Sequence, residues 1–108
     1  MKTLPEHLQP YKQTPVFTEE TVPPGLLRSH TTKAGSWATI IVAKGQIRYR
    51  ILEPAIEEHL LTPARPGIVE PRVPHELVLL GPVEFYVEFH REAGETTTGD
   101  GPSGPSYP

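Results

Sequence analysis

The chain contains no cysteine, which excludes disulfides, thiolate metal sites and a cysteine nucleophile. It has no apolar run near the roughly 20 residues that a membrane-spanning helix needs, and residues 1–7 lack the apolar region of a signal peptide. Lys and Arg number 10 against 13 Asp and Glu, so no basic surface for nucleic acid is expected. These absences predict a cytoplasmic protein that binds neither nucleic acid nor membranes.

Proline is abundant, with 14 residues among 108. A proline inside a helix removes a hydrogen bond and clashes with the preceding turn, so this composition favours short strands joined by stiff turns. Gly35 and Gly45 are expected at turns that need a positive φ. The length fits one domain, and we expect it to be all-β with almost no helix.

The pattern of apolar residues predicts where the strands lie. Residues 37–43 are rich in β-branched and aromatic side chains. Residues 46–52 alternate polar and apolar positions, which directs Ile47, Tyr49 and Ile51 inward. The other segments expected to be extended are residues 15–18, 26–30, 58–62, 68–70, 75–80 and 83–89. Strands at this spacing are typical of an antiparallel sandwich or barrel.

The end of the sequence differs in composition from the rest. Residues 92–108 contain almost no apolar side chains, so they cannot offset the entropy lost on ordering. We therefore expect a domain at residues 1–91, with an extended N-terminal arm, and a disordered tail at residues 92–108.

Two blocks of residues resemble known motifs. The first is His-Thr-Thr-Lys-Ala-Gly-Ser-Trp at residues 30–37, and the second is Glu-Pro-Arg-Val-Pro-His at residues 70–75. Together they resemble the two cupin motifs and, more narrowly, the small cupin domains related to tellurite-resistance protein B (TehB-like). The resemblance extends over about residues 11–89. It implies a single-domain cupin, a jelly-roll barrel that is often dimeric and binds its ligand inside.

Histidines are the main residues of the expected metal or ligand site. His7 and His90 lie near the ends of the domain and are expected to be exposed. His30 matches the first histidine of the first cupin motif, and His75 matches the histidine of the second. The resemblance implies that these two side chains converge on a metal ion or a ligand inside the barrel.

The remaining ligands of a metal depart from the cupin pattern. Thr32 stands where a second histidine belongs, and Ala38 stands where a glutamate belongs. Glu70 and Glu88 are the carboxylates that could replace them, although the alternation in the last strand turns Glu88 outward. Two imidazoles and a carboxylate suit zinc, iron, nickel or manganese, so a divalent metal ion is the expected cofactor.

Three other side chains are candidates for ligand binding. Lys33 could attract an anion at the mouth of the barrel, or be a solvated loop residue. Trp37 could stack on a ligand, or pack in the core or an interface. His59 shares its alternation with Leu61, so it is expected to point inward.

Two functions remain open from the sequence. The first is a metal-dependent cupin, enzyme or sensor, that binds a small molecule or an oxyanion and is linked through its family to tellurite or other oxyanion stress. The second is a metal-free binding or regulatory module that forms a homodimer through sheet edges. In some relatives the cupin domain precedes a methyltransferase domain. None is expected in this chain, so methyl transfer is not expected of it alone.

Overall fold

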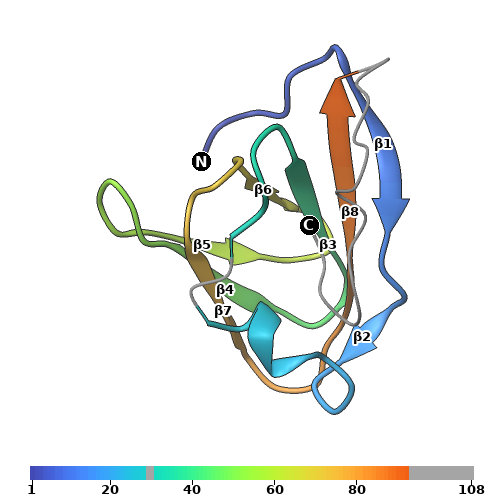
Figure 1. Ribbon diagram of the computed structural model, residues 1–108. Helices are drawn as coiled ribbons and strands as arrows, with labels where there is room; N and C mark the ends of the chain where they lie inside the picture. Colours follow the sequence, from blue (N-terminus) through green and yellow to red (C-terminus); the bar gives the residue numbers. More distant parts are fainter. Residues whose placement is uncertain (29–30, 93–108) are drawn as a thin grey trace.

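The computed structural model describes residues 1–28 and 31–92 (Figure 1). This part of the chain forms strands and a single turn of 3-10 helix, η1 (Pro24–Leu26). The strands are β1 (Leu8–Gln13), β2 (Phe17–Thr18), β3 (Trp37–Lys44), β4 (Ile47–Ile51), β5 (Glu57–Leu61), β6 (Gly67–Val69), β7 (His75–Leu79) and β8 (Glu84–Glu92).

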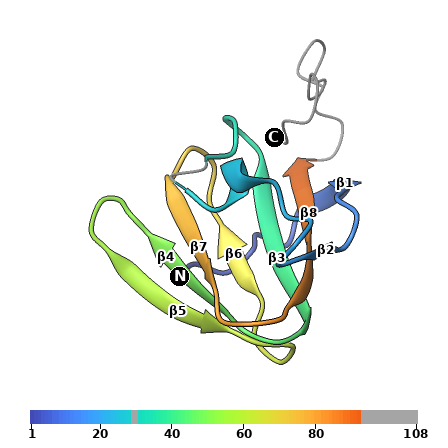
Figure 2. The same ribbon diagram turned by 90° about the horizontal axis from the view of Figure 1, so that it is seen from below.

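The strands form two antiparallel sheets. The larger has the order β1-β8-β3-β6, with β2 paired to β8 beside β1, and the smaller has the order β5-β4-β7. Figure 2 shows the smaller sheet on the left, facing the larger sheet. The prediction of an all-β, jelly-roll-like domain is confirmed.

The core lies between the sheets and follows the alternation of the strands. Along β4, Ile47, Tyr49 and Ile51 are buried, whereas the residues between them face outward. On the facing sheet, the ring of Phe85 lies edge-on to Phe17 at 5.8 Å between centroids. Each such side chain contributes roughly 1.5–3 kcal/mol by leaving water, so the side chains buried between the two sheets stabilise the fold.

Two elements differ from the expectation. The strand expected over residues 26–30 is wrong where the structure describes it, because Pro24 begins a 3-10 turn that ends after the buried Leu26; residues 29 and 30 lie outside the described part. Conversely, β1 was not expected as a strand. It pairs with β8 through a register shift between Pro10 and Lys12, an irregularity that lets an edge strand contain proline.

The turn glycines and the end of the last strand can also be compared with the expectation. Gly35 and Gly45 have φ values of 78° and 85°, which confirms that they occupy turns requiring a positive φ. β8 continues to Glu92, and the rest of the expected tail lies outside the described residues. Within the described part, no helix is long and apolar enough to cross a bilayer.

Candidate functional site

A small cavity lies between the two sheets. Its volume is about 20 Å³, enough for a water molecule or a ligand of very few atoms. The lining residues are Leu26, Thr32, Ala38, Ile40, Val69, His75, Leu77, Val87 and Phe89. Thr32 and His75 are the polar members of this set, so any guest meets an almost wholly apolar surface.

His75 is the first residue of β7 and is only 4% exposed. Its ring lies nearly perpendicular to that of Tyr49, with 5.6 Å between centroids. The Nδ1 atom is 3.3 Å from the carbonyl oxygen of Val73. Because a carbonyl oxygen only accepts, Nδ1 carries the proton in this contact.

Thr32 joins the loop before β3 to the turn between β6 and β7. Its hydroxyl donates to the backbone carbonyl of Glu70 at 3.4 Å, and the backbone N–H of Arg72 donates to the carbonyl of Thr32 at 3.0 Å. Arg72 has a φ of 61°, so the turn adopts a left-handed conformation at this position. Thr32 therefore holds two loops together at the edge of the cavity.

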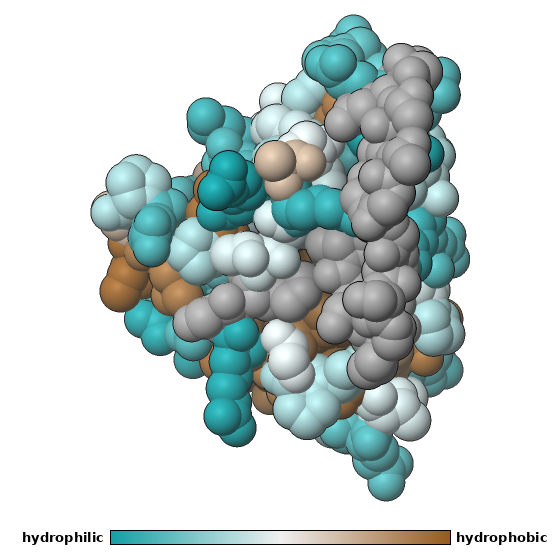
Figure 3. Space-filling model, in the orientation of Figure 1, coloured by the Kyte–Doolittle hydropathy of each residue, from teal (hydrophilic) through white to brown (hydrophobic). Residues whose placement is uncertain are grey.

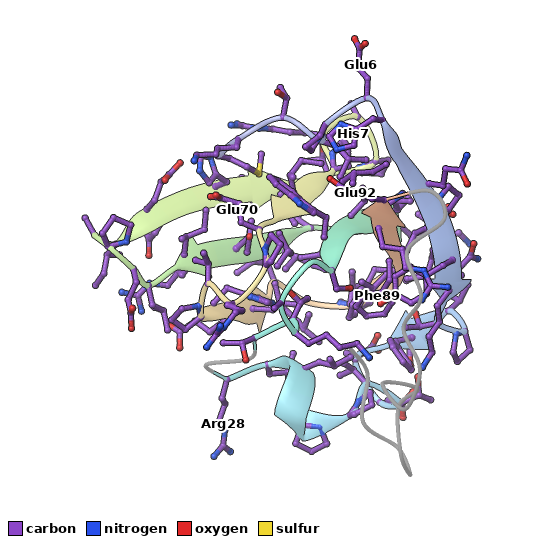
Figure 4. All side chains as sticks on the ribbon, turned by 45° about the horizontal axis from the view of Figure 1, so that its top comes forward. Glu6, His7, Arg28, Glu70, Phe89 and Glu92 are labelled. Carbon is purple, nitrogen blue, oxygen red and sulfur yellow. The ribbon has the colours of Figure 1, made fainter. Side chains whose placement is uncertain are left out.

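The two carboxylates expected to complete a metal site do not reach the cavity. His30 lies outside the described residues. The carboxylate of Glu70 pairs with Lys2 at 3.3 Å, and Figure 4 labels its position. Glu88 lies 3.6 Å from His90 Nε2. Neither carboxylate lines the cavity, and the described residues contain no cluster of three or more His, Cys, Asp and Glu that could hold a metal.

His59 points inward, as its alternation indicated, but both of its ring nitrogens are engaged. Nε2 lies 2.6 Å from a carboxylate oxygen of Glu57, and the guanidinium of Arg65 lies 3.2 Å from Nδ1. An arginine only donates, so Nδ1 accepts and Nε2 donates. The ring is thereby fixed beside Glu57 and does not line the cavity.

Met1 contacts residues of both β5 and β6. The amino group of Met1 contacts the Glu57 carboxylate, and these hydrogen bonds from Met1 and His59 lower the pKa of Glu57. The Met1 sulfur accepts the N–H of Ile68 at 3.2 Å. The Tyr49 hydroxyl donates to the carbonyl of Ile68 at 2.9 Å, and burial raises the pKa of Tyr49.

Trp37 and Lys33 lie away from the cavity. Trp37 lines a surface groove of about 490 Å³ together with Pro5, His7, Leu8, Gly35 and Glu92. Figure 4 shows His7 and Glu92 side by side at this groove, and His7 Nε2 is 3.2 Å from Glu92. Lys33 is half-buried near Lys12, whose pKa is lowered by burial and by the charge of Lys33.

His90 is buried, contrary to the expectation that it is exposed, whereas His7 is exposed as expected. β3 and β8 place His90 beside Thr39, whose hydroxyl lies 3.1 Å from Nε2. Burial lowers the pKa of His90, and the nearby Glu88 opposes this effect.

We expect stability to fall as the pH drops through the ordinary pKa of histidine, about 6.5. The lowered pKa of His90 means that the unfolded chain binds the proton more readily than the folded one. His90→Gln should flatten the dependence of the urea midpoint between about pH 7.5 and 5.5. His7→Gln, at an exposed histidine, is the control, and an unchanged slope in His90→Gln would contradict the assignment.

Comparisons with known proteins agree with this architecture. A family model of the TehB-like domain matches residues 12–87. TehB from Haemophilus influenzae strain 10810, named a probable S-adenosyl-L-methionine-dependent methyltransferase, is 36% identical over 74 residues. That alignment covers 65% of this chain and 26% of the relative, so the chain spans about a quarter of the curated relative's length.

Two solved structures share the fold. The crystal structure of Haemophilus influenzae TehB matches with a TM-score of 0.74 and 32% identity, over 81% of this chain and 32% of that one. A protein from Escherichia coli strain K12 matches with a TM-score of 0.77 and 18% identity, over 85% of this chain and 98% of that one, and shows the fold alone. The two sheets and the small cavity between them define a small jelly-roll-like domain. The chain belongs to the TehB-like family.

These findings correct the expected cofactor. Among the described residues, which do not include His30, no cluster of three or more His, Cys, Asp and Glu could hold a metal. The expected divalent metal ion, whether zinc, iron, nickel or manganese, is contradicted by the curated relative of the same family, which is named as dependent on S-adenosyl-L-methionine. That molecule does not fit the cavity either, since about 20 Å³ is far below the roughly 300–1,000 Å³ of pockets that enclose drug-sized ligands.

Proposed function

We propose that this domain is a metal-free binding module that holds a very small neutral molecule between its sheets, with His75 as a polar side chain in contact with it. The observation that carries the proposal is a histidine only 4% exposed at a cavity where Thr32 is the other polar side chain among the described lining residues. Ligand sites combine apolar walls with a few placed polar groups. His75 supplies such a group, and its contact with Val73 fixes the ring.

The lining of the cavity favours a neutral guest over an oxyanion. Moving an ion into an apolar space costs several kcal/mol unless a fixed opposite charge pairs with it. Neither Thr32 nor His75 carries a permanent charge, and Lys33 is not among the lining residues. We therefore place any link to tellurite or other oxyanions outside the cavity.

The relatives suggest the setting in which the module acts. They are named as methyltransferases and are about four times as long as the matched segment. We propose that the domain assists a methyltransferase reaction by binding a small reactant or product, while other residues bind S-adenosylmethionine. The small volume of the cavity supports this division, because it leaves no room for a nucleoside.

Nuclear magnetic resonance titration of the ¹⁵N-labelled chain tests the proposal. The probes are methanethiol, which can donate a hydrogen bond, xenon, which cannot, and tellurite. Methanethiol and xenon should shift the amide signals of Val69 and Leu77, and His75→Leu should weaken the binding of methanethiol more than that of xenon. Tellurite should leave these signals unchanged.

A variant that fills the cavity tests whether methanethiol binds there. Ala38 is 1% exposed and lines the cavity, so Ala38→Leu should abolish the methanethiol shifts, at a stability cost of about 1–3 kcal/mol. Ala64→Leu, at an exposed loop position, should keep them. A melting curve confirms that both variants fold, and shifts that persist in Ala38→Leu would disprove the site.

The same titration examines the groove beside Trp37. Its volume of about 490 Å³ lies within the range of small-molecule sites. Trp37 therefore remains a proposed contact for a larger ligand, and Lys33, which is not among the residues that line the groove, remains a proposed contact for an anionic one. Because the chain has one tryptophan, its indole signal reports on this groove separately from the cavity.

A further inference from the structure

Three cationic side chains from separate segments gather beside the cavity. Lys12 belongs to β1, Lys33 to the loop before β3, and Arg91 to β8. All three are half-buried. Figure 3 shows mostly hydrophilic surface along the right-hand edge of the molecule, where Figure 1 places β1.

Tyr11 connects the three segments. The guanidinium carbon of Arg91 lies 4.3 Å from the centre of the Tyr11 ring. The Tyr11 hydroxyl is 2.7 Å from the Oγ atom of Ser36. The N–H of Ser36 in turn donates to the carbonyl of Lys33 at 3.1 Å, so the turn that carries Lys33 is held beside β1.

The irregularity in β1 places Lys12 in the same neighbourhood. The pairing with β8 shifts between Pro10 and Lys12, so Tyr11 is an extra residue in this strand. Such an insertion re-aims the side chains around it. Burial lowers the pKa of Lys12, and the charge of Lys33 lowers it further, as expected where two ammonium groups lie close together.

This cationic cluster, Lys12, Lys33 and Arg91, borders the cavity without lining it. Phe89, labelled in Figure 4, lines the cavity, and its ring centre is 6.4 Å from that of Tyr11. Thr32, the residue before Lys33, also lines the cavity. A group bound among the three cations would therefore lie next to the cavity and outside its apolar walls.

We propose that the cationic cluster is a binding site for a phosphate group. An anion among three like charges relieves their mutual repulsion. A phosphate dianion brings more charge and more acceptor oxygens than a carboxylate, and a guanidinium can bind two of those oxygens at once. The stacking of Arg91 on Tyr11 orients its guanidinium for such a contact.

The proposal extends the anionic contact proposed above for Lys33 and does not depend on the neutral guest of the cavity. Its ligand could be inorganic phosphate or the phosphate ester of a small metabolite, because both present the same group. Binding to the cavity is measured with methanethiol, so either site can fail while the other holds.

Titration of the ¹⁵N-labelled chain with inorganic phosphate and with glycerol 3-phosphate tests the site. The ionic strength is kept constant with sodium chloride, because added salt screens charges. Both probes should shift the amide signals of Lys12, Ser36 and Arg91 in a saturable way. Tighter binding of glycerol 3-phosphate would support an ester as the ligand, and equal binding would support the phosphate group alone.

Variants that remove one charge test which cations bind. Lys33→Gln and Arg91→Gln should each weaken phosphate binding about tenfold, the effect of losing one hydrogen bond to a charged group. Lys33→Arg, which keeps the charge, should retain most of the affinity. Lys44→Gln is the matched control, since Lys44 ends β3 and pairs with Glu84 at 3.7 Å, and it should bind phosphate normally.

Two results would overturn the phosphate site. One is the absence of saturable shifts with both probes at constant ionic strength. The other is an equal loss of affinity in Lys44→Gln and Lys33→Gln, which would show a general attraction to positive charge. A melting curve of each variant confirms that it is folded, and Lys33→Gln changes only a loop position if Arg91→Gln fails to fold.

Discussion

Gly45→Ala should lower the free energy of unfolding by at least about 3 kcal/mol, a large part of the roughly 5–15 kcal/mol that stabilises a domain. Gly45 has a φ of 85°, where a side chain costs about 1–3 kcal/mol of strain. A Cβ atom here would also lie 2.4 Å from the backbone carbonyl oxygen of Pro82 and 3.1 Å from the Cα of Val83. The turn before β4 and the turn before β8 would have to separate.

Gly81→Ala is the matched control for this prediction. Its φ of 100° imposes a similar strain, but nothing lies within 4 Å of the added Cβ. Gly25→Ala carries neither penalty. Urea denaturation of the three variants should rank them in the order Gly45, Gly81 and Gly25, from the largest loss to the smallest. Equal losses for Gly45→Ala and Gly81→Ala would show that the close approach to Pro82 costs nothing.

Phe85→Ala should cost about 3–5 kcal/mol. Phe85 is fully buried at the point where β8 pairs with β3 on one side and β2 on the other. Its removal leaves a cavity beside Phe17, with which it makes an edge-on contact, so the short β2 strand should loosen first. Urea denaturation gives the total loss, and amide exchange at Phe17 reports the loosening.

Two further variants keep this second prediction testable if Phe85→Ala fails to fold. Phe85→Leu retains most of the volume and should cost less than about 1.5 kcal/mol. Tyr86→Ala changes the neighbouring, half-buried outward position and should cost less than Phe85→Ala. A loss at Tyr86 equal to that at Phe85 would contradict the assignment of the core face.

The strands with strong alternation were predictable from the sequence because their pattern is local. Ile47, Tyr49 and Ile51 recur at every second position, which permits only one face of β4 to be buried. The turn at Gly45 was likewise predictable, since a positive φ is a local property of one residue and favours glycine. The two blocks at residues 30–37 and 70–75 and their spacing indicated the family, which the match of the family model over residues 12–87 then showed.

The candidate site was predictable only in part. His75 lines the cavity, as expected from its place in the second block. Glu88 does not, because the alternation along β8 turns it to the outer face beside His90, as the sequence indicated. Glu70 does not, because its carboxylate pairs with Lys2, which is distant in sequence and which no local pattern reports.

The sequence by itself determined the all-β class, the inward faces of the regular strands, the turn glycines and the family. The tertiary structure alone decided that β1 joins the sheet, that His90 is buried beside Thr39, and how small the cavity at His75 is. The physical reason is that pairing between strands and the volume left between sheets depend on residues far apart in the chain. Their geometry is fixed only when the two sheets pack.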